Sequence, residues 1–191
     1  MILKDKNILL AVTGSIAIYK SLELIRLFIK AGANVKVILS DGAKKFINPI
    51  TFEAISQNRV LDESSESWDK SQNYNHIDIT KWADILLIAP ATANTINKIS
   101  CGIADNLLLQ TVLACKKKII IAPAANTNMI ENPITIQSVN NLKNLGFEVL
   151  QTQTKELACK DVGNGAMLEP IDIFHKTCKE LLKTSYWENR R

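Results

Sequence analysis

The sequence predicts a single α/β domain of the doubly wound, Rossmann-like or flavodoxin-like type, with a six-stranded and mostly parallel sheet. Two apolar runs, residues 8–12 and 85–88, lack the alternation of a half-exposed strand, which favours strands buried on both faces. Segments with helical periodicity separate the strand candidates, and such alternation is typical of parallel sheets with right-handed crossovers. The length of 191 residues suits one domain.

The elements are expected in a regular order along the chain. Strands are predicted at residues 7–12, 35–39, 60–61, 85–88, 118–121 and 147–150, and helices at residues 18–31, 49–56, 76–82, 96–115, 132–145 and 171–184. Pro49 and Pro133 begin two of the helices, and Gly32 and Gly146 end two of them. Residues 62–75 are expected to form a polar surface loop and residues 152–169 a long loop. Residues 1–184 then form the domain, and residues 185–191 a tail.

Composition argues against several classes of protein. The net charge is +4, and Lys and Arg are scattered without a basic stripe interleaved with aromatic residues, so nucleic acid is not an expected partner. No apolar run of about 18 residues and no signal-peptide pattern occurs, so we expect a cytoplasmic protein that does not enter a membrane. The four cysteines, at positions 101, 115, 159 and 178, include no C-x-x-C pair, so neither a disulfide framework nor a metal site is expected.

A ligand site is expected where the first and fourth strands end, because a doubly wound sheet binds ligands where its strand order reverses. The first strand ends in TGS (residues 13–15) and the fourth in PAT (residues 90–92). Residues 91–95, ATANT, offer backbone N–H groups, hydroxyls and one amide with no bulk to block a ligand. The alternative is an ordinary strand–helix loop capped by Asn94 or Thr95.

The turn after the first strand favours a mononucleotide over a dinucleotide. It holds one glycine, Gly14, whereas the fingerprint G-x-G-x-x-G needs further glycines against a pyrophosphate. Gly14 followed by Ser15 at a helix start can hold one phosphate through N–H groups and the helix dipole, so FMN fits better than NAD. Asp41 follows the second strand, where a ribose-binding acid can occur, and a plain tight turn is the alternative interpretation of Gly14.

Three further side chains are candidates for a site. Asn126 follows the fifth strand, and its amide can both donate and accept, although an Asx turn or a helix cap would use the same residue. Cys159 lies among polar residues in a loop whose glycines let it act as a lid, unlike the other cysteines, which are expected to be inert small hydrophobes. His76 lies where a polar loop meets a helix, a place more often taken by a surface histidine, as His175 is expected to be.

Four stretches, in order along residues 7–174, resemble the flavin-dependent cysteine decarboxylases. They are TGSIAIYKSLELIRLF, NHIDITKWADILLIAPATANTINKISCGIADNLL, PAANTNMIENP and LACKDVGNGAM. The resemblance implies an FMN-dependent carboxy-lyase, and it is strongest for the branch that converts 4′-phosphopantothenoylcysteine to 4′-phosphopantetheine in coenzyme A biosynthesis. It also implies a homotrimer, or a homododecamer built of trimers, with FMN between subunits.

The resemblance also implies a role for individual residues. His76 matches the active-site histidine and can serve a neighbouring subunit's flavin, Asn126 matches the asparagine that holds the substrate carboxylate, and Cys159 matches the proton-donating cysteine. Ala158 and Met167 would join Asn126 against the substrate. The implied FMN contacts are Gly14, Ser15, Ile16, Ser40, Thr92, Ala93, Asn94, Thr95 and Ala124.

The implied reaction explains why a decarboxylase needs a flavin. In this family FMN oxidises the substrate thiol to a thioaldehyde, which takes the electron pair as CO2 leaves and gives an enethiolate. The reduced flavin then yields the saturated product, with a proton from the cysteine. A thiol suits that step because its ordinary pKa of about 8.5 keeps it mostly protonated at neutral pH.

The chain departs from the family pattern at four positions. Ala125 replaces a methionine, Ile130 a tryptophan and Lys160 a glycine, and Ala166 stands where many bacterial members have arginine. The lost bulk at Ala125 and Ile130 is expected to enlarge or reshape the substrate pocket. Many bacterial relatives continue into a synthetase domain, which the sequence to Arg191 does not include.

Three other functions fit the fold: a decarboxylase of C-terminal cysteines in peptides, a flavin prenyltransferase, and a non-catalytic FMN-binding regulatory subunit. The C-x-D-x-G-x-G loop at residues 159–165 counts against the first, and a prenyltransferase needs no such cysteine. The presence of His76, Asn126 and Cys159 together disfavours the regulatory subunit, because a binding module needs no proton donor.

Overall fold

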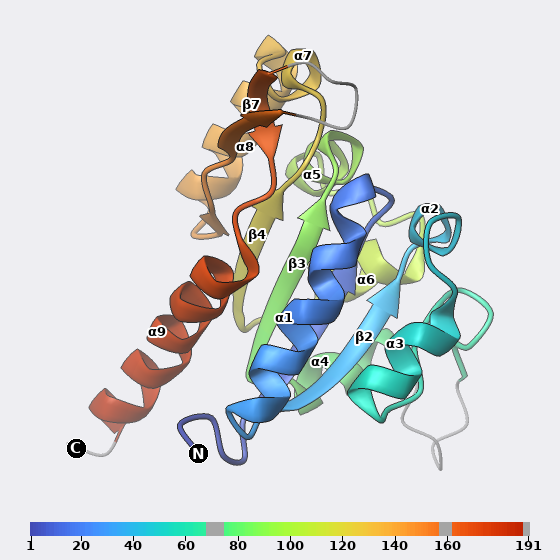
Figure 1. The fold of residues 1–191 in the computed structure, drawn as a ribbon, viewed down its shortest axis with the longest axis vertical. Helices are drawn as coiled ribbons and strands as arrows, with labels where there is room; N and C mark the ends of the chain where they lie inside the picture. Colours follow the sequence, from blue (N-terminus) through green and yellow to red (C-terminus); the bar gives the residue numbers. More distant parts are fainter. Residues whose placement is uncertain (68–74, 157–161, 189–191) are drawn as a thin grey trace.

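The computed structural model describes residues 1–67, 75–156 and 162–188, in which a five-stranded sheet lies between two layers of helices (Figure 1). All neighbouring strands pair in parallel, in the order β2-β1-β3-β4-β5. This is the flavodoxin-like order, so the predicted fold class is confirmed. The strands are β1 (Asn7–Val12), β2 (Asn34–Leu39), β3 (Ile85–Ala91), β4 (Lys118–Pro123) and β5 (Glu148–Val149).

The prediction of a sixth strand at residues 60–61 is wrong. Leu61 makes only an isolated parallel bridge to Ile38. Directly afterwards the Asp62 carboxylate accepts hydrogen bonds from the backbone N–H groups of Ser64 (3.1 Å) and Ser65 (3.0 Å). These local bonds form a turn that competes with continued strand pairing, so the chain leaves the sheet after one bridge.

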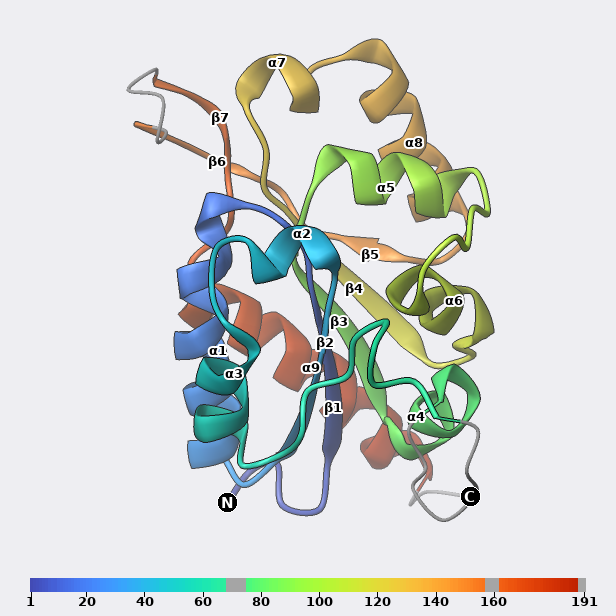
Figure 2. The same ribbon diagram turned by 90° about the vertical axis from the view of Figure 1, so that its right-hand side faces the viewer.

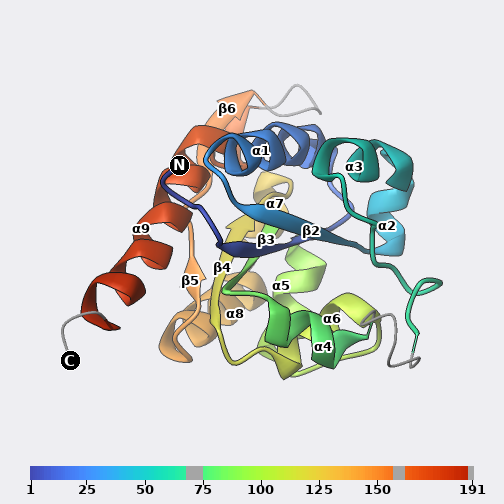
Figure 3. The same cartoon turned by 90° about the horizontal axis from the view of Figure 1, so that it is seen from below.

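Successive strand residues enter two cores on opposite faces of the sheet, and Figure 3 shows the helices that cover each face. Leu10 packs with residues of α1, α3 and α9, whereas Leu9 and Ala11 pack with residues of α4, α5, α6 and α8. Burial on both faces explains why the strand sequences show no alternation. The helices are η1 (Ile16–Ile18), α1 (Tyr19–Lys30), α2 (Asp41–Lys44), α3 (Pro49–Ser56), α4 (His76–Trp82), α5 (Ala93–Ser100), α6 (Leu107–Ala114), α7 (Thr127–Ile130), α8 (Pro133–Asn144) and α9 (Pro170–Glu188).

Two helix predictions differ from the structure. The segment predicted as one helix at residues 96–115 is two helices, because Gly102 adopts a left-handed backbone (φ +69°) after α5 and Asn106 begins α6 as its N-cap. Helix α9 continues to Glu188, beyond the expected end near residue 184. Within the described residues, no helix has both the length and the hydrophobicity needed to cross a membrane.

The long loop predicted at residues 152–169 contains an antiparallel hairpin. Its strands are β6 (Gln153–Glu156) and β7 (Val162–Ala166), and they project away from the sheet beside α7 (Figure 2). The sequence does not predict β7 because the strand contains Gly163 and Gly165, and glycine has a low strand propensity. Ala158, Cys159 and Lys160 lie outside the described residues.

Candidate active site

A cavity of about 530 Å³ lies at the carboxyl ends of the central strands. It is placed where predicted: β1 lies between β2 and β3, so the chain leaves β1 and β3 in opposite directions and opens a crevice between their ends. Its walls are residues 13–15, 39–42, 63, 92, 94, 95, 98, 106–109, 124–126 and 129.

Five helix N-caps line this cavity. They are Ser15 of η1, Ser40 of α2, Thr92 of α5, Asn106 of α6 and Asn126 of α7. In each case the side-chain oxygen accepts a hydrogen bond from the first turn, at 2.9–3.3 Å. Helix N-termini carry partial positive charge and unsatisfied N–H groups, so this wall favours an anionic ligand. The expectation of a cap at Asn94 or Thr95 is wrong, since Thr92 caps α5.

Thr13 ties together the two strand ends that flank the crevice. Its hydroxyl donates to the carbonyl oxygen of Pro90 (2.7 Å) and accepts from the backbone N–H of Thr92 (3.0 Å). Beside it, a Cβ on Gly14 would lie 2.8 Å from the carbonyl carbon of Gly42, so only glycine allows the first loop to approach the start of α2 so closely. The Thr13 hydroxyl and the close approach of Gly14 to Gly42 therefore fix the backbone on both sides of the crevice.

Most of the predicted flavin contacts line the cavity. Gly14, Ser15, Ser40, Thr92, Asn94, Thr95 and Ala124 do so, together with the predicted catalytic residue Asn126. Ile16 and Ala93 are absent from the wall: the Ile16 side chain is exposed, and Ala93 is buried in the helix layer. The sequence analysis assigned no role to several other wall residues, namely Leu39, Gly42, Glu63, Lys98, Met129 and residues 106–109.

Asn126 is both a helix cap and a residue of the cavity wall, the two interpretations that the sequence left open. It caps α7, with its Oδ1 accepting from the N–H of Asn128 at 2.9 Å. It also faces the cavity beside Ala125 and Met129. Because the cap uses Oδ1, the amide nitrogen is the end that would donate to a carboxylate.

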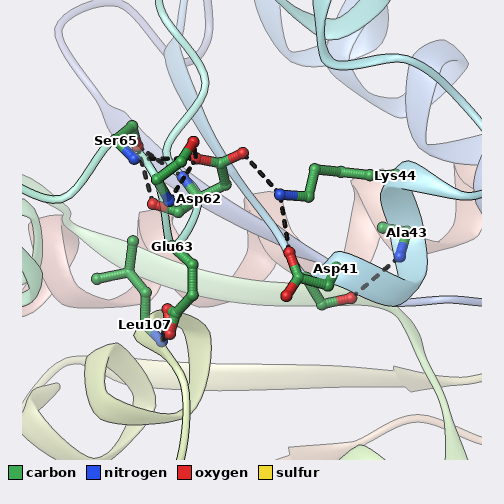
Figure 4. A network of polar contacts seen from close by, with 9 residues as sticks. Asp41, Ala43, Lys44, Asp62, Glu63, Ser65 and Leu107 are labelled. Atoms are coloured by element: carbon green, nitrogen blue, oxygen red, sulfur yellow. Dashed lines mark hydrogen bonds and ion pairs between the residues drawn. The ribbon is translucent and has the colours of Figure 1, made fainter.

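An acidic turn at residues 62–65 lies beside the cavity, and its Glu63 lines the wall; Figure 4 shows the polar contacts of this turn. Lys44 Nζ lies 2.9 Å from Asp62 Oδ2 and 2.7 Å from Asp41 Oδ1, and the hydrogen bonds to Asp41 and Asp62 raise the pKa of Lys44. Burial alone would raise the pKa of Asp62, but hydrogen bonds from Ser64 and Lys44 outweigh burial and hold this pKa below its ordinary value. Asp41 is mostly exposed, so Asp62 is the partner that fixes Lys44.

Glu63, the residue after Asp62, links this turn to α6. Both of its carboxylate oxygens accept from the backbone N–H of Leu107, at 2.7 and 2.9 Å (Figure 4). On the same wall Lys98 pairs with Asp105 at 2.5 Å. Among the described residues, no three His, Cys, Asp or Glu side chains are grouped to hold a metal ion.

The hairpin lies directly against the Asn126 segment. The Ala125 N–H donates to the carbonyl oxygen of Gly165 at 3.1 Å. A Cβ on Gly165 would lie 2.0 Å from the Ala125 carbonyl oxygen, and one on Gly163 would lie 2.0 Å from the Thr127 hydroxyl. The two glycines are therefore needed for close contact between β7 and the Asn126 segment. The strand β7 follows residues 157–161 in the sequence, so this contact holds the chain directly after those residues against the Asn126 segment.

Charged residues anchor the end of the hairpin. The ammonium group of Lys20, which is almost buried, donates to the carbonyl oxygen of Met167 (3.0 Å) and to Glu169 (3.1 Å), and Glu169 also pairs with Lys155. The hydrogen bond from Lys155 is the main cause that lowers the pKa of Glu169. Met167 is itself buried and does not line the cavity, unlike the contact expected from the sequence.

Two predicted positions lie away from the cavity wall. His76 is the first residue of α4 and does not line the cavity of its own chain, and its Nδ1 lies 2.8 Å from Glu66 Oε1. Ile130 lines a different hollow, of about 340 Å³, beside α8 and β5, whereas Ala125 lines the main cavity. The two departures from the family pattern therefore affect different spaces.

Comparisons with known proteins agree with this geometry. The flavoprotein family model matches residues 2–182. A probable phosphopantothenoylcysteine decarboxylase from Streptococcus mutans is 41% identical over 178 residues, which cover 92% of this chain and 99% of that protein. A solved PPC decarboxylase mutant complexed with pantothenoylaminoethenethiol superposes with a TM-score of 0.81 at 31% identity, over 97% of this chain and 100% of that chain. The FMN binding protein AtHal3 gives 0.81 at 34% identity, over 97% and 98%.

Another relative is much longer than this chain. The coenzyme A biosynthesis bifunctional protein CoaBC of Bacillus subtilis is 40% identical over 171 residues, which are 90% of this chain but only 42% of that protein. The match to the Streptococcus mutans protein, in contrast, extends over nearly the whole of both chains. The chain belongs to the flavoprotein family and, within it, to the phosphopantothenoylcysteine decarboxylases.

Proposed function

We propose that this chain binds FMN and uses it to decarboxylate 4′-phosphopantothenoylcysteine to 4′-phosphopantetheine in coenzyme A biosynthesis. The observation that carries the proposal is the cavity at the β1/β3 crevice, walled by five helix N-caps that include Asn126. Relatives that this chain matches over most of their length are named for this reaction. The cytoplasm is the compartment proposed for it.

The cavity fits a flavin mononucleotide in size and chemistry. Its volume of about 530 Å³ is that of a typical cofactor pocket. Gly14 and Ser15, at the start of η1, lie on the wall, where the partial positive charge of a helix start favours a phosphate. Leu39, Leu108 and Ala124 supply apolar wall for a flat ring. When bound, FMN supplies reversible oxidation of the substrate thiol, which provides the electron sink that the loss of CO2 requires.

The protein's own residues bind the substrate and move protons. We assign Asn126 to hold the substrate carboxylate through its amide nitrogen, so that the bond to CO2 is fixed relative to the flavin. His76 handles a proton near the flavin, and Cys159 donates the last proton to the product. Ala158 is assigned to the substrate side of the site.

The position of His76 supports a role for a second subunit. Since His76 is absent from the cavity wall of its own chain, its role depends on a neighbouring copy whose cavity it reaches. We therefore propose a homo-oligomer, a trimer or a dodecamer of trimers, with FMN close to the subunit interface. The flavin-binding unit spans residues 1–184, in line with the family match to residues 2–182.

Product analysis tests the function. The purified protein, loaded with FMN, is incubated with phosphopantothenoylcysteine and, separately, with cysteine-ending peptides, and the products are weighed by mass spectrometry. We expect loss of CO2 only from the first substrate, with a saturated product. Turnover of the peptides instead would identify a peptidyl-cysteine decarboxylase. FMN binding without turnover of either substrate would identify a regulatory subunit.

A further inference from the structure

The backbone around His76 is fixed by a well-made helix start. Asn75 caps α4, with its Oδ1 accepting from the N–H groups of Ile77 (3.0 Å) and Asp78 (2.9 Å). The Asn75 amide in turn donates to the Asp78 carboxylate at 2.7 Å. Helix α4 packs on α6 in the layer below the sheet. The freedom that remains to His76 is therefore rotation of its side chain.

A carboxylate limits that rotation. Glu66 Oε1 lies 2.8 Å from His76 Nδ1, and the two side chains are only 22% and 20% exposed. An ionised carboxylate can only accept hydrogen bonds, so the ring nitrogen that faces it is Nδ1–H. In the neutral ring the nitrogen left to accept a proton is then Nε2, which lies on the far side of the imidazole.

Glu66 follows directly after the turn at residues 62–65, and Figure 4 shows the hydrogen bonds of Asp62 in this turn. Asp62 accepts from the N–H groups of Ser64 and Ser65 and from Lys44, and its own N–H donates to the Ser65 hydroxyl at 2.7 Å. Glu63 attaches the same turn to the start of α6. The turn is thus bound to α2 on one side and to α6 on the other, and Glu66 starts from a fixed backbone.

We infer that Glu66 is a positioning residue that fixes the tautomer and the orientation of the His76 imidazole, so that Nε2 is the atom presented to the reaction. The inference rests on the proposed function, which places His76 beside a neighbouring subunit's flavin. The Glu66–His76 contact joins two segments ten residues apart in sequence. Partly exposed pairs of this kind contribute little to stability. Loss of Glu66 should therefore change the tautomer and orientation of the imidazole and leave the free energy of unfolding nearly unchanged.

Nuclear magnetic resonance of the imidazole nitrogens tests this directly. The chain has two histidines, so selective ¹⁵N-histidine labelling together with His175→Gln assigns the signals of His76. We expect the Nδ1–H tautomer in the wild type and its loss in Glu66→Ala, with partial retention in Glu66→Gln, whose amide oxygen can still accept. Glu23→Ala, an exposed glutamate on α1, is the matched control and should leave the spectrum unchanged. An identical His76 spectrum in the wild type and in Glu66→Ala overturns the inference.

Kinetics of CO2 release provide the second arm, measured with the FMN-loaded protein and phosphopantothenoylcysteine. Glu66→Ala should slow the reaction about tenfold or more, with unchanged flavin content. Because Glu66 acts through His76, adding Glu66→Ala to His76→Ala should cause no further loss. An unchanged rate in Glu66→Ala, or losses that multiply in the double variant, overturns the role. If the wild type releases no CO2 at all, the proposed function fails, whereas the tautomer measurement still decides whether Glu66 orients the ring.

Discussion

Replacing Gly165 by alanine should separate the hairpin from the Asn126 segment. The new Cβ would lie 2.0 Å from the Ala125 carbonyl oxygen, so the two backbones have to part by about 1 Å before an ordinary contact is restored. Overpacking of this kind costs about 1–3 kcal/mol, and losing the Ala125 N–H to Gly165 hydrogen bond adds about 1 kcal/mol. We therefore expect a loss of about 2–4 kcal/mol in the free energy of unfolding.

Thermal unfolding and turnover measure the two consequences of Gly165→Ala. The stability loss should lower the Tm by about 5–15 °C, and displacement of Asn126 by about 1 Å should slow decarboxylation about a hundredfold. FMN should still bind, since the loops at Gly14 and Thr92 are untouched. Gly102→Ala is the matched control: nothing lies within 4 Å of its Cβ, so only the strain at φ +69° remains, about 1 kcal/mol. A Gly165→Ala variant with wild-type Tm and turnover would refute the close contact.

Three other changes test separate parts of the account. Thr13→Val leaves the Pro90 carbonyl and the Thr92 N–H without their bridge and should cost about 1–3 kcal/mol in urea unfolding, with weaker FMN binding. Asp62 has a lowered pKa, so its contribution to stability is present above its unfolded pKa of about 3.9 and is lost as pH falls through the lower folded value. In Asp62→Asn the free energy of unfolding should therefore depend less on pH in the acid range. Asn126→Ala should keep bound flavin and lose decarboxylation about a hundredfold, as measured by CO2 release.

Specific outcomes would contradict each of these. Wild-type FMN affinity and stability in Thr13→Val would mean that its hydroxyl does not hold the crevice. The same stability loss below pH 4 in Asp62→Asn as in the wild type would assign the acid sensitivity to other carboxylates. Loss of flavin from Asn126→Ala, in place of lost turnover, would move Asn126 from the substrate to the cofactor.

Much of the crevice could be predicted from the sequence because the residues that mark it lie close to the strand ends. Unbroken apolar runs at β1 and β3 required burial on both faces, and small polar residues after Thr13 and Pro90 marked the strand ends that meet at the reversal of strand order. Asn126 was found the same way, at the end of β4. Each of these residues lies within a few positions of a strand end, so periodicity and turn chemistry were sufficient.

The remainder depends on contacts distant in sequence. Glu63 reaches the cavity only because its turn binds Lys44 and the N–H of Leu107, 44 residues away, and no local pattern marks such a contact. The strand β7 forms because Gly165 lies against Ala125, although glycine alone predicts a loop. At residues 60–61 the apolar pair indicates a strand that the structure does not contain. The hydrogen bonds of the Asp62 carboxylate end the pairing with β2 after one bridge.

The central claim, that the β1/β3 crevice holds FMN with its phosphate at the helix that begins at Ser15, is tested most directly by comparing two flavins. Quenching of flavin fluorescence gives the Kd for FMN and for riboflavin, which lacks the phosphate, in the wild type and in Ser15→Asp. A carboxylate at this helix start occupies the phosphate's place and repels it. We predict that the wild type prefers FMN and that Ser15→Asp loses this preference while its riboflavin affinity is unchanged. Equal affinity of the wild type for both flavins, or no binding of either, would contradict the account.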